Sequence, residues 1–291
     1  MNFLVVGTIC NCEKTIISTI NSLSESLKGA DKVEYFFVES DSSDRSLDIL
    51  MRLKKENKYF NFETHGNLSK KTKSRTSRLA FCRNRYLSYV RKNSKFFSYY
   101  LIVVDMDGIF RKFECDLFDE INSEVDWAVM TANVKGRYYD IWALREEEWS
   151  PNDCWLAARE SQINGLNKYL SYVNNVYSRM IKINKRNKNI FVKSAFGGLA
   201  IYKISLIPKE AEYLGINSDG EEICEHVNFH KSIDHKESGK IFINPRLIIG
   251  PSPSEHTKNS GIIGTKLFWL RCVKESILKY FFNNLEGSDS F

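Results

Sequence analysis

Residues 100–110, which read YLIVVDMDGIF, decide the class of fold that this sequence predicts. The apolar run at 100–104 is typical of a strand covered on both faces, as in a parallel sheet. Asp105 and Asp107 follow where that strand would end, and ligands of α/β proteins gather at the carboxyl ends of parallel strands. Buried carboxylates need a cation or hydrogen-bond donors beside them, and a divalent metal carrying a diphosphate meets this need. The alternative is that one Asp caps the next turn while the other faces solvent.

Strand and helix patterns alternate on both sides of this stretch. Short apolar runs predict strands at residues 3–8, 33–38, 61–64, 125–132, 196–202 and 240–249. Amphipathic spacing predicts helices at residues 13–27, 45–55, 79–92 and 221–231. This order of elements predicts an α/β fold, with a mixed, mostly parallel sheet flanked by helices. We expect one domain over residues 1–265, followed by a C-terminal amphipathic helix and tail over residues 266–291.

The composition narrows the class of protein. The 291-residue chain is 43% hydrophobic and 13% aromatic, which is enough for a full core. Its net charge of +6 suits phosphates or anionic surfaces but is too weak to indicate nucleic acid, and no nucleic-acid-binding motif accompanies it. Seven scattered cysteines fit reduced thiols, and neither a signal peptide nor a run of about 20 apolar residues is present. We therefore expect a cytoplasmic protein, with the inner face of a membrane as an alternative location.

The order of five segments resembles that of glycosyltransferases with the GT-A fold, in particular the large inverting family that begins with a PTYN-like turn. The segments are residues 7–11 (GTICN) at the PTYN turn, residues 39–44 (ESDSSD) at the D-x-x-S-x-D turn, residues 79–84 (LAFCRN) at the A-R-N helix, residues 105–107 (DMD) at the metal motif, and residues 224–227 (CEHV) at the Glu-Asp-Val position. The CEHV string, with residues 243–246 (INPR), is also similar to fungal capsule-associated α-mannosyltransferases, which retain configuration.

The resemblance implies a nucleoside diphosphate sugar as donor, with UDP or GDP as its nucleotide. In such a site Glu39 takes the place of the carboxylate that receives the base, and Arg83 would neutralise the leaving diphosphate. The other donor-binding candidates are Thr8, Asp41, Asp105, Gly197 and Gly198. The two glycines open a predicted strand, where glycine lets a backbone approach a ligand closely.

The resemblance also implies a divalent metal, Mn²⁺ or Mg²⁺. Such an ion acts as a Lewis acid on the diphosphate, and Mg²⁺ is held by one or two carboxylates plus the phosphates themselves. We expect Asp107 to be a direct ligand, and Asp105 to bind the metal through water or to accept from the ribose hydroxyls. GT-A enzymes often complete the metal shell with a late histidine, so His256 is the candidate third ligand. An ordinary surface histidine is the alternative for His256.

The acceptor side departs from the family pattern at His226, which replaces the Asp that inverting members use as general base. Either Glu225 or His226 would then deprotonate the acceptor, unless the enzyme is not inverting. His226 and His230 are four residues apart and share a helix face, a spacing that can hold a metal, but no third ligand accompanies them. Aromatic residues Trp142, Trp149 and Trp155 would stack on acceptor sugars or pack in the core.

These features favour a metal-dependent hexosyltransferase that acts on a saccharide or lipid-linked acceptor in surface glycan synthesis. A nucleotidyltransferase also uses paired Asp residues, but it normally has a glycine-rich basic loop that residues 7–11 lack. A non-catalytic nucleotide- or glycan-binding module on the same fold is the remaining alternative. The amphipathic stretch at 266–282 predicts a helix that docks on the core, or one that makes peripheral contact with a membrane.

Overall fold

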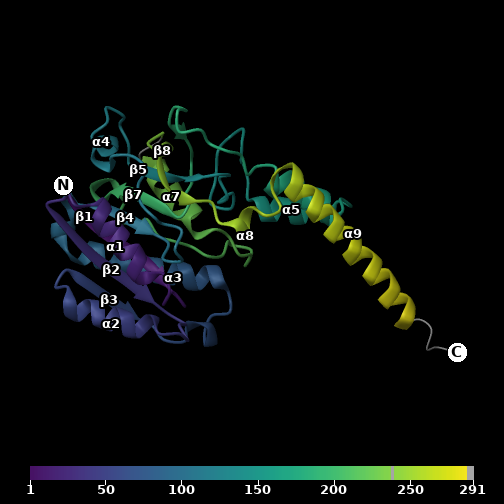
Figure 1. Ribbon diagram of the computed structural model, residues 1–291, viewed down its shortest axis with the longest axis horizontal. Coiled ribbons are helices and arrows are strands. Elements are labelled where there is room, and N and C mark those ends of the chain that lie inside the picture. The colour runs from purple at the N-terminus through teal and green to yellow at the C-terminus, as the bar shows by residue number, and fades with distance from the viewer. Residues whose placement is uncertain (237–238, 287–291) are drawn as a thin grey trace.

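A computed structural model describes residues 1–236 and 239–286, the residues from 275 to 286 by their backbone alone. Its strands form one eight-stranded sheet in the order β3-β2-β1-β4-β7-β5-β8-β6 (Figure 1). The strands are β1 (Asn2–Ile9), β2 (Lys32–Glu39), β3 (Phe60–Thr64), β4 (Tyr100–Val104), β5 (Val129–Lys135), β6 (Ile190–Phe191), β7 (Leu199–Lys203) and β8 (Ile241–Pro251). The α-helices are α1 (Ile16–Ser26), α2 (Ser46–Glu56), α3 (Arg75–Lys92), α4 (Leu117–Ile121), α5 (Cys154–Ile163), α6 (Lys168–Tyr172), α7 (Glu225–Lys236), α8 (Ser254–Thr257) and α9 (Gly261–Glu286).

The sheet is mixed, with parallel pairing among β1 to β4 and between β5 and β8. Antiparallel pairs join β7 to β4 and to β5, and β6 to β8. The predicted mixed, mostly parallel sheet flanked by helices is therefore confirmed. Predicted strand 125–132 begins later, at Val129, and the helix predicted from residue 79 already begins at Arg75, where Ser74 accepts a hydrogen bond from the Ser77 amide.

Both faces of the sheet are covered because side chains alternate along each strand. In β1, Leu4 and Val6 belong to the apolar cluster that includes α3 and α7. Phe3 and Val5 belong to the opposite cluster, which includes α1, α2 and α4. A strand that is buried on both faces reads as a continuous apolar run, which explains the sequence of β4.

The carboxyl ends of β1 and β4 meet at one edge of the sheet. A Cβ on Gly7 of β1 would lie 2.5 Å from the carbonyl oxygen of Val104, so only glycine allows this approach. The Asp105 amide donates to the Gly198 carbonyl oxygen at 2.9 Å, because β7 runs antiparallel to β4 and begins at the same edge. Asp105 and Asp107 therefore lie at the edge where the parallel and antiparallel parts of the sheet join.

Helices α6 and α9 pack against each other. Figure 1 shows α9 at one end of the molecule, away from β1 to β3. The last helix begins at Gly261, before the predicted boundary at residue 266, because Gly261 adopts a positive φ of 73° that starts a new helical direction. Phe268 is buried and its ring stacks on Tyr172 at 6.1 Å. One face of α9 therefore docks on the protein. No helix in the described part of the chain is long and apolar enough to cross a membrane.

Candidate functional site

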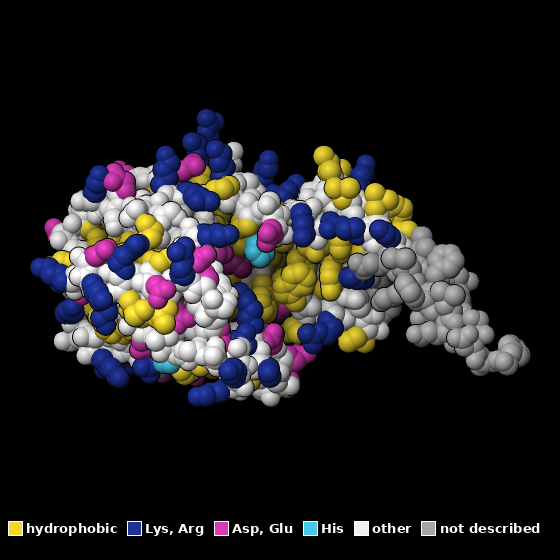
Figure 2. Space-filling model, turned by 60° about the horizontal axis from the view of Figure 1, so that its bottom comes forward, with side chains coloured by type: hydrophobic (Ala, Val, Ile, Leu, Met, Phe, Trp, Pro, Cys, Tyr) yellow, Lys and Arg dark blue, Asp and Glu magenta, His cyan; other side chains and the backbone are white. Residues whose placement is uncertain are grey.

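A cavity of about 630 Å³ opens at the carboxyl ends of β1 and β4. Figure 2 shows a hollow near the middle of the molecule, with hydrophobic side chains along it. The lining residues come from β1 and the turn after it, from α3, from the DMD motif, from residues 139–142, from α5 and from the beginning of α7. Residues 176, 177, 180, 196, 255, 256, 258 and 259 also line it, so segments far apart in the sequence contribute to one site.

Arg83 is the buried cation of this cavity. Its Nε donates to Glu225 Oε1 at 2.9 Å, and its Nη2 lies 3.5 Å from Asp105 Oδ1. The guanidinium also lies over the Phe196 ring, 5.2 Å from its centre. Burial opposes the charge of Arg83, but Tyr86, Glu225 and Asp105 together raise its pKa well above the ordinary value. Arg83 is thus a fixed positive charge that joins α3, the end of β4 and α7.

Carboxylates gather around this cation. Burial raises the pKa of Asp105 to about 7; Arg83 opposes the rise, and Asp107, Asp140 and Glu225 add to it. Several acidic groups therefore share one cavity with one buried guanidinium. A further cation, or a ligand that brings one, would relieve their mutual repulsion.

The carboxylate oxygens of Asp105 and Asp107 are suitable ligands for a hard divalent cation, but two side chains supply only part of its coordination shell. Asp107 is exposed at the cavity, and its Oδ1 accepts from the Ile109 amide at 3.2 Å, so it also caps the following turn. In the described chain, no three His, Cys, Asp or Glu side chains are grouped to hold a metal. His256 lines the same cavity as these two Asp residues, and its ring packs 5.3 Å from Tyr139. The expected shell of Asp105, Asp107 and His256 therefore stays a prediction. Two carboxylates that leave positions for diphosphate oxygens still suit Mg²⁺ or Mn²⁺.

The two histidines of α7 have different surroundings. His230 is fully bonded inside the fold, with Nδ1 3.0 Å from the Ser194 hydroxyl and Nε2 2.8 Å from the Tyr202 hydroxyl. His226 stacks on Phe196 at 3.9 Å, and neither of its buried ring nitrogens has a hydrogen-bond partner among the described residues. Burial, with Arg83 nearby, lowers the pKa of both rings. A metal pair is thus excluded by the bonds of His230, and His226 is a neutral ring at neutral pH.

Asp140 is a cavity carboxylate that the sequence did not reveal. Its Oδ2 accepts from the Gly197 amide at 2.9 Å, and burial raises its pKa. This contact joins residues 57 positions apart, so no local motif marks it. Asp140 does stand within the aromatic stretch 138–142, which was the available signal.

Gly197 and Gly198 follow the cavity-lining residue Phe196 and are not themselves among the lining residues. Both have positive φ, 70° and 92°. A Cβ on Gly197 would lie 2.7 Å from the Ala132 carbonyl oxygen, and one on Gly198 would lie 3.0 Å from the Tyr139 hydroxyl. They form a tight turn in which the Gly197 amide donates to Asp140, and their expected role as the floor of a sugar pocket stays a prediction.

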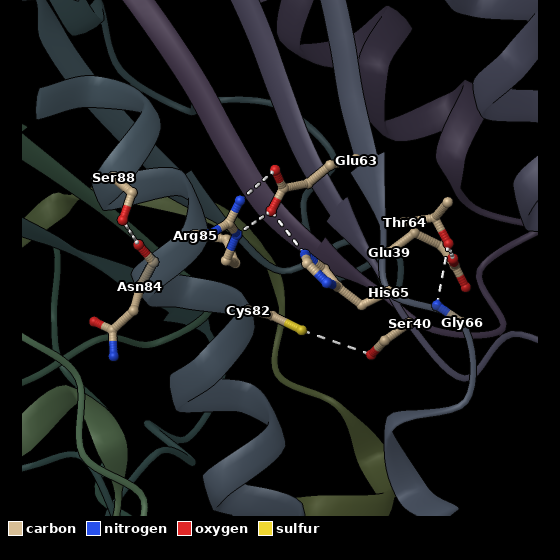
Figure 3. Close-up of polar contacts among 10 residues, drawn as sticks. All are labelled: Glu39, Ser40, Glu63, Thr64, His65, Gly66, Cys82, Asn84, Arg85 and Ser88. Atoms are coloured by element: carbon tan, nitrogen blue, oxygen red, sulfur yellow. Dashed lines mark hydrogen bonds and ion pairs between the residues drawn. The ribbon is translucent and has the colours of Figure 1, made fainter. Parts of the chain in front are cut away.

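The predicted nucleotide-binding residues divide into two groups. Thr8 lines the cavity, whereas Glu39 and Asp41 do not. Glu39 is buried at the end of β2 and accepts a hydrogen bond from the Ser42 amide. It also accepts one from the Thr64 hydroxyl (Figure 3). Asp41 has a positive φ of 61° and accepts from the Ser69 amide. Glu39 and Asp41 therefore shape the acidic turn after β2, and their contact with a base or ribose stays a prediction.

Arginines elsewhere on α3 are engaged outside the cavity. Arg85 donates to Glu63 at 2.6 Å, and His65 shares the same carboxylate at 2.8 Å (Figure 3). Arg78 pairs with Asp41 at 3.5 Å. Arg75 and Arg83 line the cavity, so these two can face a phosphate.

The three tryptophans Trp142, Trp149 and Trp155 have different surroundings. Trp142 and Trp155 line the cavity, and Trp155 is 37% exposed, so it offers a ring to a ligand. Trp149 instead packs edge-on against Tyr138, and its indole donates to the Arg179 carbonyl oxygen at 2.7 Å. Core packing is thus observed for Trp149, whereas stacking of Trp142 or Trp155 on an acceptor sugar stays a prediction.

No protein-family model matches this sequence. No curated protein matches it either. Among solved structures, the chain is similar to S. aureus TarS in complex with UDP-GlcNAc, with 14% identity, 90% of this chain and 62% of that chain covered, and a TM-score of 0.49. It is also similar to the mannosyltransferase PcManGT from Pyrobaculum calidifontis in complex with GDP-Man and Mn²⁺, with 11% identity, 85% and 56% coverage, and a TM-score of 0.48.

A third similar structure is glucosyl-3-phosphoglycerate synthase from Mycobacterium tuberculosis in complex with UDP, with 12% identity and a TM-score of 0.41. The match covers 87% of this chain and 71% of that one. This chain thus spans less than two thirds of the TarS and PcManGT chains. At these identities the likeness concerns the fold, and the bound donors belong to those proteins.

Proposed function

We propose that this protein is a metal-dependent glycosyltransferase, which moves a sugar from a nucleoside diphosphate sugar to a saccharide or lipid-linked acceptor in surface glycan synthesis. The observation that carries the proposal is the arrangement of Asp105, Asp107 and Arg83 in one cavity at the carboxyl end of β4. Ligands of α/β proteins bind at this edge. The surplus of carboxylates suits a cation, and the buried guanidinium suits an anion.

Glycosyl transfer leaves negative charge on a diphosphate as the bond to the anomeric carbon breaks. Asp105 and Asp107 would hold Mn²⁺ or Mg²⁺, which supplies Lewis-acid stabilisation of that charge when bound. Arg83 adds a fixed positive charge whose orientation is set in advance by Glu225. Thr8 and Arg75 line the same cavity and are placed to contact the nucleotide and its phosphates.

Asp140 is the residue that we assign to the acceptor. Glu225 is 6% exposed and engaged with Arg83, so we assign it to the positioning of the guanidinium. Asp140 is more accessible than Glu225, and the Gly197 amide fixes one of its oxygens. The raised pKa makes Asp140 a better proton acceptor than an ordinary carboxylate. In this proposal Asp140 orients the acceptor hydroxyl and receives its proton.

The first test measures donor binding and donor hydrolysis with and without Mn²⁺. UDP-GlcNAc and GDP-Man are the donors to use first, because similar structures contain them. A nucleotide present at about 100 times its dissociation constant should add about 2.7 kcal/mol of apparent stability in a thermal-shift assay. Absence of both Mn²⁺-dependent nucleotide binding and hydrolysis would overturn the proposal.

A second test uses Asp107→Ala, with the exposed Asp219→Ala as matched control. Asp107→Ala should abolish hydrolysis and the Mn²⁺ dependence of nucleotide binding, whereas Asp219→Ala should leave both unchanged. Asp219→Ala should unfold at nearly the same urea concentration as the parent protein, because its side chain is exposed. Asp107→Ala should lose about 1 kcal/mol, the bond to the Ile109 amide, and remain folded. Hydrolysis by Asp107→Ala at the parental rate would show that the metal assignment is wrong.

A third test separates Asp140 from Glu225. Asp140→Asn should lower kcat for transfer to an acceptor while nucleotide binding stays intact. Glu225→Gln should weaken donor binding as well, because Arg83 loses its charged partner. The assignment of the acceptor role fails if Asp140→Asn retains parental transfer.

A further inference from the structure

The side of α9 that faces away from the protein is strongly apolar. Its exposed side chains are Ile262, Ile263, Leu267, Trp269 and Leu270, each between 49% and 77% exposed. Phe268 lies on the opposite side and is the residue that docks. Figure 1 shows α9 extending outward from the rest of the molecule. Docking therefore does not explain why the outward side is apolar, and such patches mark interaction surfaces.

Cations accompany this apolar surface without acidic residues. Residues 258–274 contain Lys258, Lys266, Arg271 and Lys274, and neither Asp nor Glu. Lys266 and Leu270 are four residues apart and so share a helix face, as do Leu270 and Lys274. Figure 2 shows lysine and arginine side chains among hydrophobic ones at this end of the molecule. The surface thus combines apolar contact with positive charge.

The charge indicates what occupies the surface. A second copy of this chain would bring the same cations against each other in a two-fold interface, and like charges across an interface oppose association. An anionic lipid surface instead complements the cations and accepts the apolar side chains. Interfacial helices have this composition, with Lys or Arg beside Trp and Leu, and tryptophan is enriched at membrane interfaces.

We propose that the outward side of α9 binds the surface of an anionic membrane. Ile262, Leu267 and Leu270 enter the region between headgroups and acyl chains, and Trp269 lies at the headgroup level. The ammonium groups of Lys266 and Lys274 reach lipid phosphates because long lysine side chains extend toward polar groups.

The position of α9 beside the cavity also indicates which class of acceptor the protein uses. Lys258 and Asn259 line the cavity and directly precede α9, and the Arg271 side chain of α9 hydrogen-bonds to Asn259. A membrane that holds α9 therefore lies close to the cavity. This step rests on the proposed glycosyl transfer, and it selects the lipid-linked acceptor over a soluble saccharide.

The test is co-sedimentation of the full chain with vesicles of phosphatidylcholine, with or without phosphatidylglycerol. Binding should appear with phosphatidylglycerol and decline as salt is raised. Trp269→Ser should weaken it, whereas Phe97→Ser, a control at a residue that is 66% exposed elsewhere, should not. Lys266→Glu should lower binding by about tenfold or more, because charge reversal removes attraction and adds repulsion at an anionic surface. Lys185→Glu, an exposed lysine outside α9, is its control.

Absence of binding to both kinds of vesicle would overturn the membrane proposal. Self-association that Trp269→Ser abolishes, without vesicle binding, would overturn it in favour of a second copy. Nucleotide binding needs no membrane, so a thermal shift with UDP or GDP and Mn²⁺ on the same samples separates this result from failure of the proposed function. Parental nucleotide binding by Trp269→Ser would also show that the variant is folded.

Discussion

Two Arg–Glu pairs in this protein have the same chemistry but different surroundings. In the Arg246–Glu120 pair, the guanidinium bonds both carboxylate oxygens, at 2.6 and 2.7 Å, and Asn244 donates a third bond to the carboxylate. In the Arg83–Glu225 pair, a single bond of 2.9 Å joins the two side chains. The buried Nη1 of Arg83 has no hydrogen-bond partner in the described chain.

The difference separates structural from functional use of the same residues. Arg246 is 48% exposed and ties β8 to α4 through two hydrogen bonds to Glu120, and its exposed part can reach solvent. Arg83 is 5% exposed, and it also faces Asp105 across the cavity. A buried guanidinium with unused donors is costly unless something else compensates it, and buried unsatisfied groups concentrate at functional sites. We infer that a ligand anion completes the surroundings of Arg83.

The largest expected effect is on turnover. Arg83→Met should lower the rate of sugar transfer by about 1,000-fold, because a fixed positive charge at a developing diphosphate is removed. Arg246→Met should leave the rate within about twofold, because that pair does not contact the cavity. Steady-state rates at saturating donor measure both effects. Equal losses in the two variants would remove the distinction between the pairs.

The next effect is on stability. Arg83→Met leaves Glu225 buried without a partner, so it should lower the free energy of unfolding by about 3 kcal/mol or more. The double change Arg83→Met with Glu225→Leu should recover most of that loss, because well-packed apolar residues replace a buried ion pair with little cost. Arg246→Met should cost less, about 1 to 2 kcal/mol, because Arg246 is half-exposed and Asn244 still donates to the buried Glu120 carboxylate. Urea unfolding measures all three. Recovery of turnover by the double variant would contradict a role for the charge itself.

The sequence predicted the sheet, and it singled out Arg83, Asp105 and Asp107, which line one cavity, because these signals are local. The apolar run of β4 and the two Asp residues beside it lie in one continuous stretch, and residue 83 lies within a recognisable helix motif. Asp140 was missed because its place is set by a contact with Gly197, far along the chain. His226 and His230 looked equivalent by helical spacing, and only the residues packed around α7 distinguish them. Sequence patterns therefore predicted the features that depend on residues adjacent in the chain, and they missed those that depend on tertiary contacts.

The two histidines of α7 allow a similar comparison, because the stability of the protein should depend on pH through the buried His230. Burial, with Arg83 nearby, lowers the pKa of His230 to about 3, while an unfolded histidine titrates near 6.5. Between these two pKa values the unfolded chain binds a proton at this ring and the folded chain does not. The free energy of unfolding therefore decreases as pH falls from about 6.5 toward 3. Between pH 7 and pH 5 this one ring should account for about 2 kcal/mol.

The measurement for this effect is urea unfolding of the parent and of His230→Gln at pH 7 and pH 5. The variant should lose about 2 kcal/mol less than the parent over this interval. The pKa of Asp105, raised to about 7 chiefly by burial, works in the opposite direction, since protonation of that carboxyl stabilises the folded state as pH falls. Both proteins contain Asp105, so its contribution cancels in the difference. Identical pH slopes would contradict a buried neutral His230.

The smallest effect should come from His226→Phe. Both ring nitrogens of His226 are buried without a partner, so an apolar ring stacked on Phe196 should raise the free energy of unfolding by about 1 kcal/mol or leave it unchanged. Transfer should stay within a few-fold of the parent if Asp140 serves the acceptor. A loss of about 100-fold with intact nucleotide binding would instead assign the acceptor proton to His226. In that case a ligand completes the hydrogen bonds of the two His226 ring nitrogens, as we infer for Nη1 of Arg83. The contrast between satisfied and unsatisfied buried groups then applies to His226 as well as to Arg83.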